Sequence, residues 1–375
     1  MAIQPDVLII GGGLAGLAGA IHLSKAGLKV TVIEKSAYPH HKVCGEYISN
    51  EILPYMQWLG LDILKLNPAA LTTFEFSTQS GKTIKAALTL GGIGISRYAL
   101  DAFLYQEALA NGCTIIKETV TEVLFINDAF KVRTKKQYLT AKIVVGAYGK
   151  RANIDQVLSR QFIAKKSGWL AVKAHYTGNF ADNVVALHNF KGGYCGVSKV
   201  ENNTINICYL ADYATFKQYK NIEDYQHNVL YKNKQLKAIL DSATPLFEKP
   251  LTISQISFDK KQAVENHILM AGDSAGLIHP LCGNGMAMAI HSAKIASELI
   301  LDYYAGKISS REDLEKAYTQ QWKKHFSKRL HMGRILAKVL RYKNLTAALM
   351  AVMGSIPVLL PILIRQTHGK PIAIN

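Results

Sequence analysis

Residues 6–34 contain the feature that most constrains the fold, a glycine-rich turn between two apolar segments. The apolar run at residues 7–10 is typical of a buried parallel strand. Gly11, Gly13 and Gly16 follow it at the Gly-x-Gly-x-x-Gly spacing. At this spacing the first glycine permits a tight turn, the second lets the backbone approach a pyrophosphate, and the third lets the next helix pack on the strand. The pattern therefore predicts a strand, a turn and a helix that bind a dinucleotide.

The residues after the turn complete this unit. Leu14 and Ala15 begin the predicted helix, whose N-terminal N–H groups would face the phosphates. The second apolar segment ends in Glu34, followed by Lys35, and a carboxylate at this place can accept both ribose hydroxyls. The glycine spacing alone is a weak motif, but here strand, helix, second strand and acid are all in register. We therefore expect these residues at the dinucleotide site.

A second glycine-rich motif lies far along the chain. A short apolar segment ends in Gly272 and Asp273, and the turn and helix start beyond it contain Pro280, Gly283, Asn284, Gly285 and Met286. This resembles the second FAD fingerprint of the glutathione-reductase-type flavoproteins. The resemblance implies that Asp273 binds the ribityl chain and that the backbone from Gly283 to Met286 faces the flavin N1–C2=O edge. Helix N–H groups there would stabilise the negative charge of a reduced flavin. FAD is therefore the expected cofactor.

Three shorter segments narrow the resemblance. Residues 95–101 resemble the Arg-x-x-Leu-Asp segment of p-hydroxybenzoate-hydroxylase-like and geranylgeranyl-reductase-like flavoproteins, in which the arginine, here Arg97, approaches FAD. The alternative is a solvated Arg97 at the start of a capped surface helix. Residues 42–45 resemble the Lys-x-Cys-Gly segment of the reductases, which implies that Cys44 and Gly45 lie near the cofactor. Residues 192–197 resemble the start of the reductase motif Gly-Tyr-x-Trp-x-Phe-Pro. We also include Val120 among the cofactor-binding candidates.

The chain departs from both families at two places. The hydroxylases carry a Gly-Ala-Asp-Gly motif whose aspartate helps to bind FAD and NADPH, and here Tyr148 stands in its place. We therefore expect NADPH alone to reduce the flavin slowly, so that NAD(P)H and another electron donor are both candidates. In the reductase motif the Trp, Phe and Pro positions are Gly196, Ser198 and Lys199. The substrate pocket should therefore differ from the standard prenyl pocket.

Composition limits the partners. The chain has 375 residues and a net charge of +17, but no basic run is interleaved with stacking aromatic residues, so nucleic acid is not expected. Five scattered cysteines form no Cys-x-x-Cys pair, which favours a reducing compartment without a metal site. The chain reaches its first predicted strand within a few residues, so we expect no signal peptide and a cytoplasmic location. The oligomeric state cannot be inferred.

The C-terminal region is also unusual. Residues 325–341 are rich in Lys, Arg and His, and residues 345–364 carry no charge. This second stretch just reaches the length of a membrane span, but Gly354, Pro357 and Pro361 interrupt it. We therefore expect two short helices that either pack on the body of the protein or lie in a lipid interface. An anionic membrane surface is the partner that this charge and apolarity favour.

The order of segments predicts the fold class, an α/β protein with a glutathione-reductase-type FAD-binding Rossmann domain. That domain is discontinuous, at residues 1–70, 96–168 and 251–330. A substrate-binding antiparallel β-sheet domain is inserted at residues 71–95 and 169–250, and residues 331–375 form a C-terminal helical segment. Strands are expected at residues 169–176, 183–190, 193–200 and 204–210, and a helix at 222–240. The pocket should lie between the two domains, at the flavin ring.

The resemblance implies an FAD-dependent oxidoreductase that acts on a lipophilic substrate. The first expectation is reduction of a C=C bond in an isoprenoid or polyketide-like molecule by hydride from flavin N5. Hydroxylation through a flavin hydroperoxide is the alternative, and a non-catalytic membrane-associated flavoprotein is a third. The catalytic candidates are Cys44, Glu46 and Tyr194. Glu46 would act as an acid if a dry pocket raised its pKa.

Overall fold

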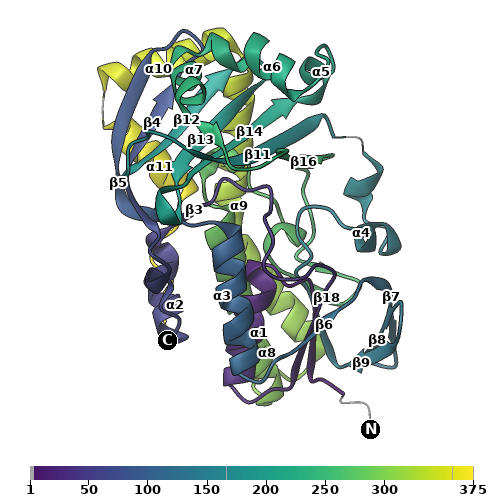
Figure 1. Ribbon diagram of the computed structural model, residues 1–375. Helices are drawn as coiled ribbons and strands as arrows, with labels where there is room; N and C mark the ends of the chain where they lie inside the picture. The colour runs from purple at the N-terminus through teal and green to yellow at the C-terminus, as the bar shows by residue number, and fades with distance from the viewer. Residues whose placement is uncertain (1–3, 166, 357, 375) are drawn as a thin grey trace.

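The computed structural model describes residues 4–165, 167–356 and 358–374, and two large sheets organise them (Figure 1). The first sheet has six strands in the order β17-β18-β10-β1-β2-β6. All its neighbouring strands are parallel except β17 and β18. Its strands are β1 (Val7–Ile10), β2 (Val30–Glu34), β6 (Thr114–Lys117), β10 (Ile143–Gly146), β17 (Val264–Glu265) and β18 (Ile268–Met270). The expected buried strand at residues 7–10 is confirmed.

Helices cover this sheet, and α1 lies at the centre of the layer (Figure 1). Small residues let α1 approach α8: a Cβ on Gly19 would lie 3.7 Å from Ser297 Oγ and 3.8 Å from Ala293 Cβ. Ser96 begins α3, because its hydroxyl accepts a hydrogen bond from Ala99 N (3.0 Å). The helices are α1 (Leu14–Lys25), α2 (Leu53–Trp58), α3 (Arg97–Ala110), α4 (Asn153–Val157), α8 (Gly285–Tyr304) and α9 (Arg311–Arg341).

A small antiparallel sheet lies beside the first, formed by β7 (Val120–Ile126), β8 (Ala129–Thr134) and β9 (Tyr138–Ala141). The sequence pattern predicts a hairpin at residues 131–134 and 137–145 that returns to the core sheet. The structure divides its second arm at Lys142, because β9 pairs with β8 whereas β10 pairs with β1. The chain therefore leaves the small sheet and re-enters the six-stranded sheet at once.

The second large sheet has nine strands, eight of them in the order β15-β11-β14-β13-β12-β4-β5-β3, with β16 beside β11. Its strands are β3 (Tyr47–Ser49), β4 (Ala69–Ser77), β5 (Thr83–Gly94), β11 (Trp169–Thr177), β12 (Val184–Phe190), β13 (Gly193–Lys199), β14 (Ile205–Asp212), β15 (Thr244–Pro245) and β16 (Leu251–Ser254). The sheet is antiparallel as expected, except that β12 and β4 are parallel. These two strands come from separate insertions, so no hairpin sets their direction.

Two segments differ from the expected domain boundaries. β3, in the segment assigned to the dinucleotide-binding domain, pairs with β5 in the nine-stranded sheet. β16 begins at residue 251, where the sequence predicts a return to the dinucleotide-binding domain, but it still pairs with β11. The chain therefore returns to the six-stranded sheet only at β17 and β18.

Helices α5 (Tyr213–Phe216), α6 (Ile222–Asn228) and α7 (Lys234–Ser242) pack on the nine-stranded sheet (Figure 1). The sequence predicts one helix over residues 222–240. In the structure α6 ends at Asn228, a short 3-10 helix follows, and α7 begins after Asn233, whose side chain accepts hydrogen bonds from the Gln235 and Leu236 N–H groups. The amide nitrogen of Asn233 donates to Ser77 Oγ (2.8 Å), which joins this turn to β4.

The two expected C-terminal helices are confirmed as α10 (Lys343–Ser355) and α11 (Leu359–Thr367). Pro361 lies in the first turn of α11, and Pro357, the other expected interruption, lies outside the described residues. Among the described helices, none by itself has the length and apolarity of a membrane span. Ala348–Ser355 and Leu359–Thr367 meet that standard only as a pair, by length and composition, with a bend of 117° between them.

Candidate cofactor and substrate site

A cavity of about 280 Å³ lies between the two large sheets and extends to the C-terminal helices. It brings together most of the residues that the sequence predicts for the site. Those that line it are Gly13, Leu14, Ala15, Cys44, Gly45, Glu46, Arg97, Tyr194, Gly272, Asp273, Pro280, Gly283, Gly285 and Met286. Those that do not line it are Gly11, Gly16, Glu34, Lys35, Val120 and Asn284.

The first glycine motif forms a cradle at one end of the cavity. Gly11 has φ +103°, and a Cβ there would lie 2.5 Å from the Ala147 carbonyl oxygen. A Cβ on Gly16 would collide with the Gly11 carbonyl oxygen. At Gly13 a Cβ would meet no atom closer than 3.4 Å, so this backbone faces the open cavity. The space left there suits a pyrophosphate, as the spacing predicts.

Glu34 ends β2 beside this cradle and is buried. Its Oε2 accepts a hydrogen bond from Gly12 N (2.8 Å), and its Oε1 accepts one from Ser36 N (2.9 Å). The carboxylate is therefore fixed against the glycine turn, where its remaining lone pairs can reach a ribose. Lys35 is exposed, and Val120 begins β7 within the main hydrophobic core.

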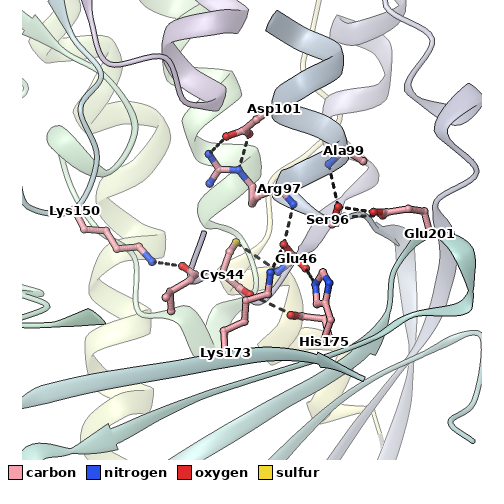
Figure 2. Close-up of polar contacts among 12 residues, drawn as sticks. Cys44, Glu46, Ser96, Arg97, Ala99, Asp101, Lys150, Lys173, His175 and Glu201 are labelled. Atoms are coloured by element: carbon pink, nitrogen blue, oxygen red, sulfur yellow. Dashed lines mark hydrogen bonds and ion pairs between the residues drawn. The ribbon is translucent and has the colours of Figure 1, made fainter. Parts of the chain in front are cut away.

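Two cations and one carboxylate stand over Gly13 (Figure 2 shows Arg97 and Asp101). Arg97 Nε and Nη2 donate to the two oxygens of Asp101 (2.7 and 2.8 Å), and Lys42 Nζ donates to Asp101 Oδ2 (2.8 Å). Burial by itself would raise the pKa of Asp101, but Arg97 and Lys42 hold it below its ordinary value. The trio therefore carries one positive charge, which suits a pyrophosphate. The alternative of a solvated Arg97 is wrong.

The second glycine motif forms the facing end of the cavity. Gly272 has φ +61°, and its N–H donates to Ser292 Oγ (2.8 Å). α8 begins at Gly285, and within the described residues the preceding Asn284 side chain makes no capping hydrogen bond. The first N–H groups of α8 are therefore left for a ligand in the cavity, and they favour a negative charge. Asp273 and the start of α8 thus line the same cavity, where the resemblance implies contacts with FAD.

A lysine that the sequence reasoning missed supports this motif. Lys261 Nζ donates to the backbone oxygens of Asp273 and Lys150 (2.8 Å each). Burial lowers the pKa of Lys261 to about 8. It ties the Asp273 turn to the loop after β10. A lone lysine in a polar loop gives no sequence signal for this role.

A buried ion pair supports the turn before α8 on the side away from the cavity. The sequence reasoning missed this pair too. Arg329 Nη1 on α9 donates to Glu51 Oε1 (2.9 Å) and to Asn284 Oδ1 (3.0 Å). Asn284 Nδ2 donates in turn to Glu51 Oε2 (3.3 Å). Ile372 N donates to the Glu51 backbone oxygen (2.8 Å), so the last described residues reach the same place. Asn284 therefore acts through this network and not on the cavity.

Glu46 lies in a buried cluster between the two sheets (Figure 2). Its Oε1 accepts from Lys173 Nζ (2.7 Å) and Arg97 N (2.8 Å), and its Oε2 lies 2.6 Å from His175 Nε2. Burial alone would raise the pKa of Glu46, but the hydrogen bond to His175 and the charge of Lys173 lower it below its ordinary value. The condition under which Glu46 would act as an acid, a raised pKa, is therefore not met, because two basic residues of β11 face the carboxylate.

The sequence does contain a signal for these partners. Lys173 and His175 are two apart on β11, so both point to the same face of the sheet. Leu170 and Val172 alternate with them and pack in the core on the other face. Two ionisable residues on the inner face of a strand indicate a buried polar cluster. Only the fold shows which carboxylate joins it.

Cys44 and Tyr194 line the same cavity. Cys44 is half-buried, and its carbonyl oxygen accepts a hydrogen bond from Asn206 Nδ2 (3.3 Å). Lys150 Nζ donates to the neighbouring Val43 carbonyl oxygen (3.1 Å), as Figure 2 shows. Tyr194 on β13 is buried, which raises its pKa well above the ordinary value. Its phenol is therefore neutral.

Beyond these polar groups the cavity is lined mostly by apolar side chains. They come from the inner face of the nine-stranded sheet and from the C-terminal helices. Examples are Phe74, Phe76, Leu88, Leu187 and Leu210 from the sheet, and Leu336, Leu340, Met350, Met353, Leu360 and Ile364 from the helices. The site is therefore an anion-binding cradle joined to an apolar chamber.

Tyr148 fills the place where the hydroxylase motif has aspartate. Arg160 Nη1 donates to the Tyr148 hydroxyl (3.3 Å), which donates in turn to Met270 Sδ (3.4 Å). Arg160 also pairs with Asp155 (3.0 Å). Burial raises the pKa of Tyr148 above its ordinary value. The ring is thus held inside the domain by its own contacts.

Comparison with known proteins agrees with this geometry. Residues 4–330 match the family described as "FAD binding domain". Conditioned medium factor receptor 1 from Dictyostelium discoideum is 24% identical over 88% of this chain and 69% of its own length. A digeranylgeranylglycerophospholipid reductase from Methanoculleus marisnigri is 25% identical over 85% of this chain and 81% of its own.

The fold is also that of a solved flavoenzyme. The flavin-dependent brominase Bmp2 superimposes with a TM-score of 0.79 at 18% identity, covering 97% of this chain and 93% of its own. At this identity the likeness concerns the fold alone. The family match covers most of the chain and both glycine motifs, and it confirms FAD as the cofactor. The chain belongs to the FAD-binding-domain family and is an FAD-dependent oxidoreductase.

Proposed function

We propose that the protein reduces a C=C bond in a lipophilic isoprenoid or polyketide-like substrate. The observation that carries this proposal is the apolar chamber that opens directly beside the start of α8. A molecule bound there would be surrounded by hydrocarbon, with few polar groups to hold a small hydrophilic substrate. The relative from Methanoculleus marisnigri, whose name gives an isoprenoid lipid as its substrate, supports the same class. We also infer that the FAD-binding half is of the glutathione-reductase type.

The chain's residues divide the work as follows. FAD, when bound, would supply the hydride. Gly13 and Arg97 would hold its pyrophosphate, and Asp273 its ribityl chain. The backbone N–H groups at the start of α8 would stabilise negative charge on the reduced ring. Reduction of a C=C bond also needs a proton at the second carbon, and the cavity offers the Cys44 thiol and the Tyr194 phenol for it.

Glu46 has a different part in this proposal. With its pKa lowered it is ionised at neutral pH and cannot donate a proton. It instead holds Lys173 and His175 in the buried cluster between the two sheets, and it accepts a hydrogen bond from the backbone N–H of Arg97. We therefore assign Glu46 a positioning role between the two sheets.

The shape of the chamber departs from that of the reductases at one position. Gly196 stands where the reductase motif has tryptophan, and it lines the cavity. A Cβ at Gly196 would lie 3.6 Å from Leu187 Cδ2 and from the Cys208 carbonyl oxygen, which is ordinary van der Waals contact, so a side chain can begin there without strain. The missing indole widens the chamber. This supports a substrate bulkier near the flavin than the standard prenyl chain.

The test is reoxidation of the reduced protein. The flavin is photoreduced without oxygen, then mixed with polyprenyl lipids, polyketide-like alkenes or oxygen. We expect a lipophilic alkene to reoxidise the flavin and to yield the saturated product. Gly196→Trp should retain FAD but lose this reaction, whereas Ser198→Ala, in the same lining, should behave like the wild type. Substrate-dependent oxygen uptake with a hydroxylated product would instead assign the monooxygenase alternative.

The electron donor is measured in the same cuvette. We propose that NADPH alone reduces the flavin slowly, because Tyr148 occupies the place of the hydroxylase aspartate. Rapid NADPH oxidation that the substrate accelerates would contradict this and would favour the hydroxylase. No reoxidation by any lipophilic alkene, with FAD fully bound, would overturn the proposed reduction.

A further inference from the structure

We propose that the outer surface of α9, α10 and α11 docks on an anionic lipid bilayer. Figure 1 shows α10 and α11 at one edge of the molecule, beside β4 and β5. Three observations carry the proposal: a cationic stripe on α9, the lack of carboxylate side chains in this region, and an apolar outer face on α10 and α11. The docking does not depend on which reaction the flavin performs.

The stripe follows one side of the second half of α9. Its exposed residues recur every three or four positions, so they lie on one face of the helix. They are Lys324, Lys328, His331, Ile335, Lys338 and Tyr342, the last just beyond the helix. No hydrogen bond or ion pair among the described residues uses Lys324, Lys328 or Lys338. Three cations therefore face outward along the helix that leads into α10.

The charge of this region has one sign. Residues 316–375 contain eleven Lys and Arg and no Asp or Glu, while the whole chain carries +17. Surfaces of soluble domains normally mix both signs. A segment with no carboxylate side chain complements a surface of uniform negative charge. Each Lys or Arg close to an anionic bilayer adds about 1 kcal/mol of attraction, which salt screens.

The two helices that follow expose apolar side chains as well as burying them, and α11 also exposes Arg365 and Gln366. Met350, Met353 and Leu360 are buried and line the cavity. The opposite face is exposed and should therefore be polar in a soluble protein. It carries instead Leu345, Val352, Ile356, Val358 and Ile362, each between 45% and 61% exposed. Four exposed positions, three in α10 and one directly after it, are three or four residues apart, so they share one side of the helix. These positions are 345, 348, 352 and 356.

A bilayer fits this surface better than a protein partner does. Apolar helices flanked by cations are the features of a helix that lies in the headgroup region, with its apolar face a few ångströms deep. The bend of 117° lets both α10 and α11 lie along such a surface rather than cross it. One layer of helix then separates lipid from the chamber. If the proposed function is right, a lipophilic substrate passes from the bilayer to the chamber without crossing water.

The experiment is sedimentation of the FAD-loaded, full-length protein with vesicles of known composition. We expect it to sediment with phosphatidylglycerol-containing vesicles at low salt, to be partly released at high salt, and to stay in solution with pure phosphatidylcholine. Val352→Glu/Ile356→Glu should lose binding. Its control, Leu124→Glu/Ile126→Glu, adds the same charges on the exposed side of β7 and should bind as before.

The cationic stripe is tested with the same logic. Lys324→Glu/Lys328→Glu/Lys338→Glu should abolish binding. Lys117→Glu/Lys135→Glu/Lys136→Glu alters the net charge equally at exposed sites outside the stripe and should leave binding unchanged. Flavin absorbance and melting temperature show that every variant is folded. A non-specific effect of net charge would weaken both sets alike and would overturn the assignment of this surface.

Two further outcomes would overturn the proposal. One is wild-type protein that stays in the supernatant with anionic vesicles at low salt. The other is a dimer that forms with increasing protein concentration in the absence of lipid and that Val352→Glu/Ile356→Glu dissociates. In that case a second copy of the chain would cover the outer surface of α10 and α11. Turnover of detergent-dispersed substrate is measured separately. It stays intact if only the docking idea is wrong, and it is absent if the proposed reduction is wrong.

Discussion

At the scale of single residues, Gly13 decides whether a pyrophosphate can lie in the cradle. We expect Gly13→Val to abolish FAD binding. The valine methyl groups would point into the space that Arg97 and Lys42 border, at 3.4 and 3.9 Å from the new Cβ. These distances leave the fold itself unstrained. The measurement is the flavin absorbance of the purified variant and its FAD affinity after reconstitution.

The control separates loss of the cradle from loss of the fold. Gly168→Val adds the same side chain where a Cβ meets no atom within 4 Å, and it should keep FAD. An unchanged FAD affinity in Gly13→Val would show that the pyrophosphate lies elsewhere. A Gly13→Val chain that unfolds would be recognised by its melting curve.

Residue types were predictable at this scale, but their partners were not. The glycine spacing predicts the cradle, because each glycine is needed where a side chain would collide with nearby backbone or fill the ligand space. The state of Glu46 could not be predicted, because Lys173 and His175 lie 127 and 129 residues away and only the sheet brings them together. A carboxylate in a dry pocket and one facing two bases titrate in opposite directions. The sequence shows the carboxylate without its surroundings.

At the scale of elements, the Glu51–Arg329 pair joins α9 to the segment after β3 and to the start of α8. Removing one partner leaves the other buried and unpaired, which typically costs about 3–5 kcal/mol. We expect Arg329→Met to lower the free energy of unfolding by about that amount and to weaken FAD binding. We expect the FAD effect because Asn284, which directly precedes α8, loses the hydrogen bond that it accepts from Arg329.

A double-mutant cycle checks this interpretation. Glu51→Gln/Arg329→Met should lose less stability than the two single variants add up to, because no charge is left buried. Denaturant unfolding gives the free energies, and FAD titration gives the affinity. Additive losses would mean that the two side chains do not act as a pair. An unchanged FAD affinity would separate the pair from the cofactor site.

Elements with local causes were predictable, and those with distant causes were not. The β1–α1–β2 unit, the antiparallel strands and the two C-terminal helices follow from apolar periodicity and from Gly and Pro. The predicted helix over residues 222–240 is two helices, and the second begins at Asn233, which is fixed to Ser77, 156 residues away. The parallel pairing of β12 with β4 likewise depends on where two separate insertions meet. Apolar periodicity carries no information about contacts between segments that are distant in the sequence.

At the scale of the whole molecule, buried histidines predict how stability depends on pH. Burial lowers the pKa of His188 to about 4, of His22 to about 4 and of His291 to about 3, from an ordinary 6.5. Between pH 6.5 and these pKa values, the three histidines are protonated in the unfolded chain but neutral in the folded protein. The contribution of these histidines to the free energy of unfolding is therefore greatest above pH 6.5. It falls as the pH drops toward 4, by about 1.4 kcal/mol per pH unit for each histidine.

His188 allows a clean measurement of one such group. Its Nδ1 lies 2.8 Å from Ser77 Oγ, and a glutamine can make a similar contact without titrating. We expect denaturant midpoints measured from pH 7.5 to 4 to fall less steeply for His188→Gln than for the wild type. The carboxylates are common to both proteins and cancel in the comparison. Parallel curves would show that His188 has the same pKa in the folded protein and in the unfolded chain.

The discontinuity of the six-stranded sheet has a consequence for the order of synthesis. β1 and β2 emerge from the ribosome first, but β18, which completes the sheet beside β10, begins at residue 268. At about 5–20 residues per second, β10, which pairs with β1 on its other side, waits on the order of ten seconds for that partner. During this time the free edge of Ile143–Gly146 has unpaired backbone groups that another chain could bind. A nascent chain of this protein should therefore depend on chaperones early and capture its flavin late.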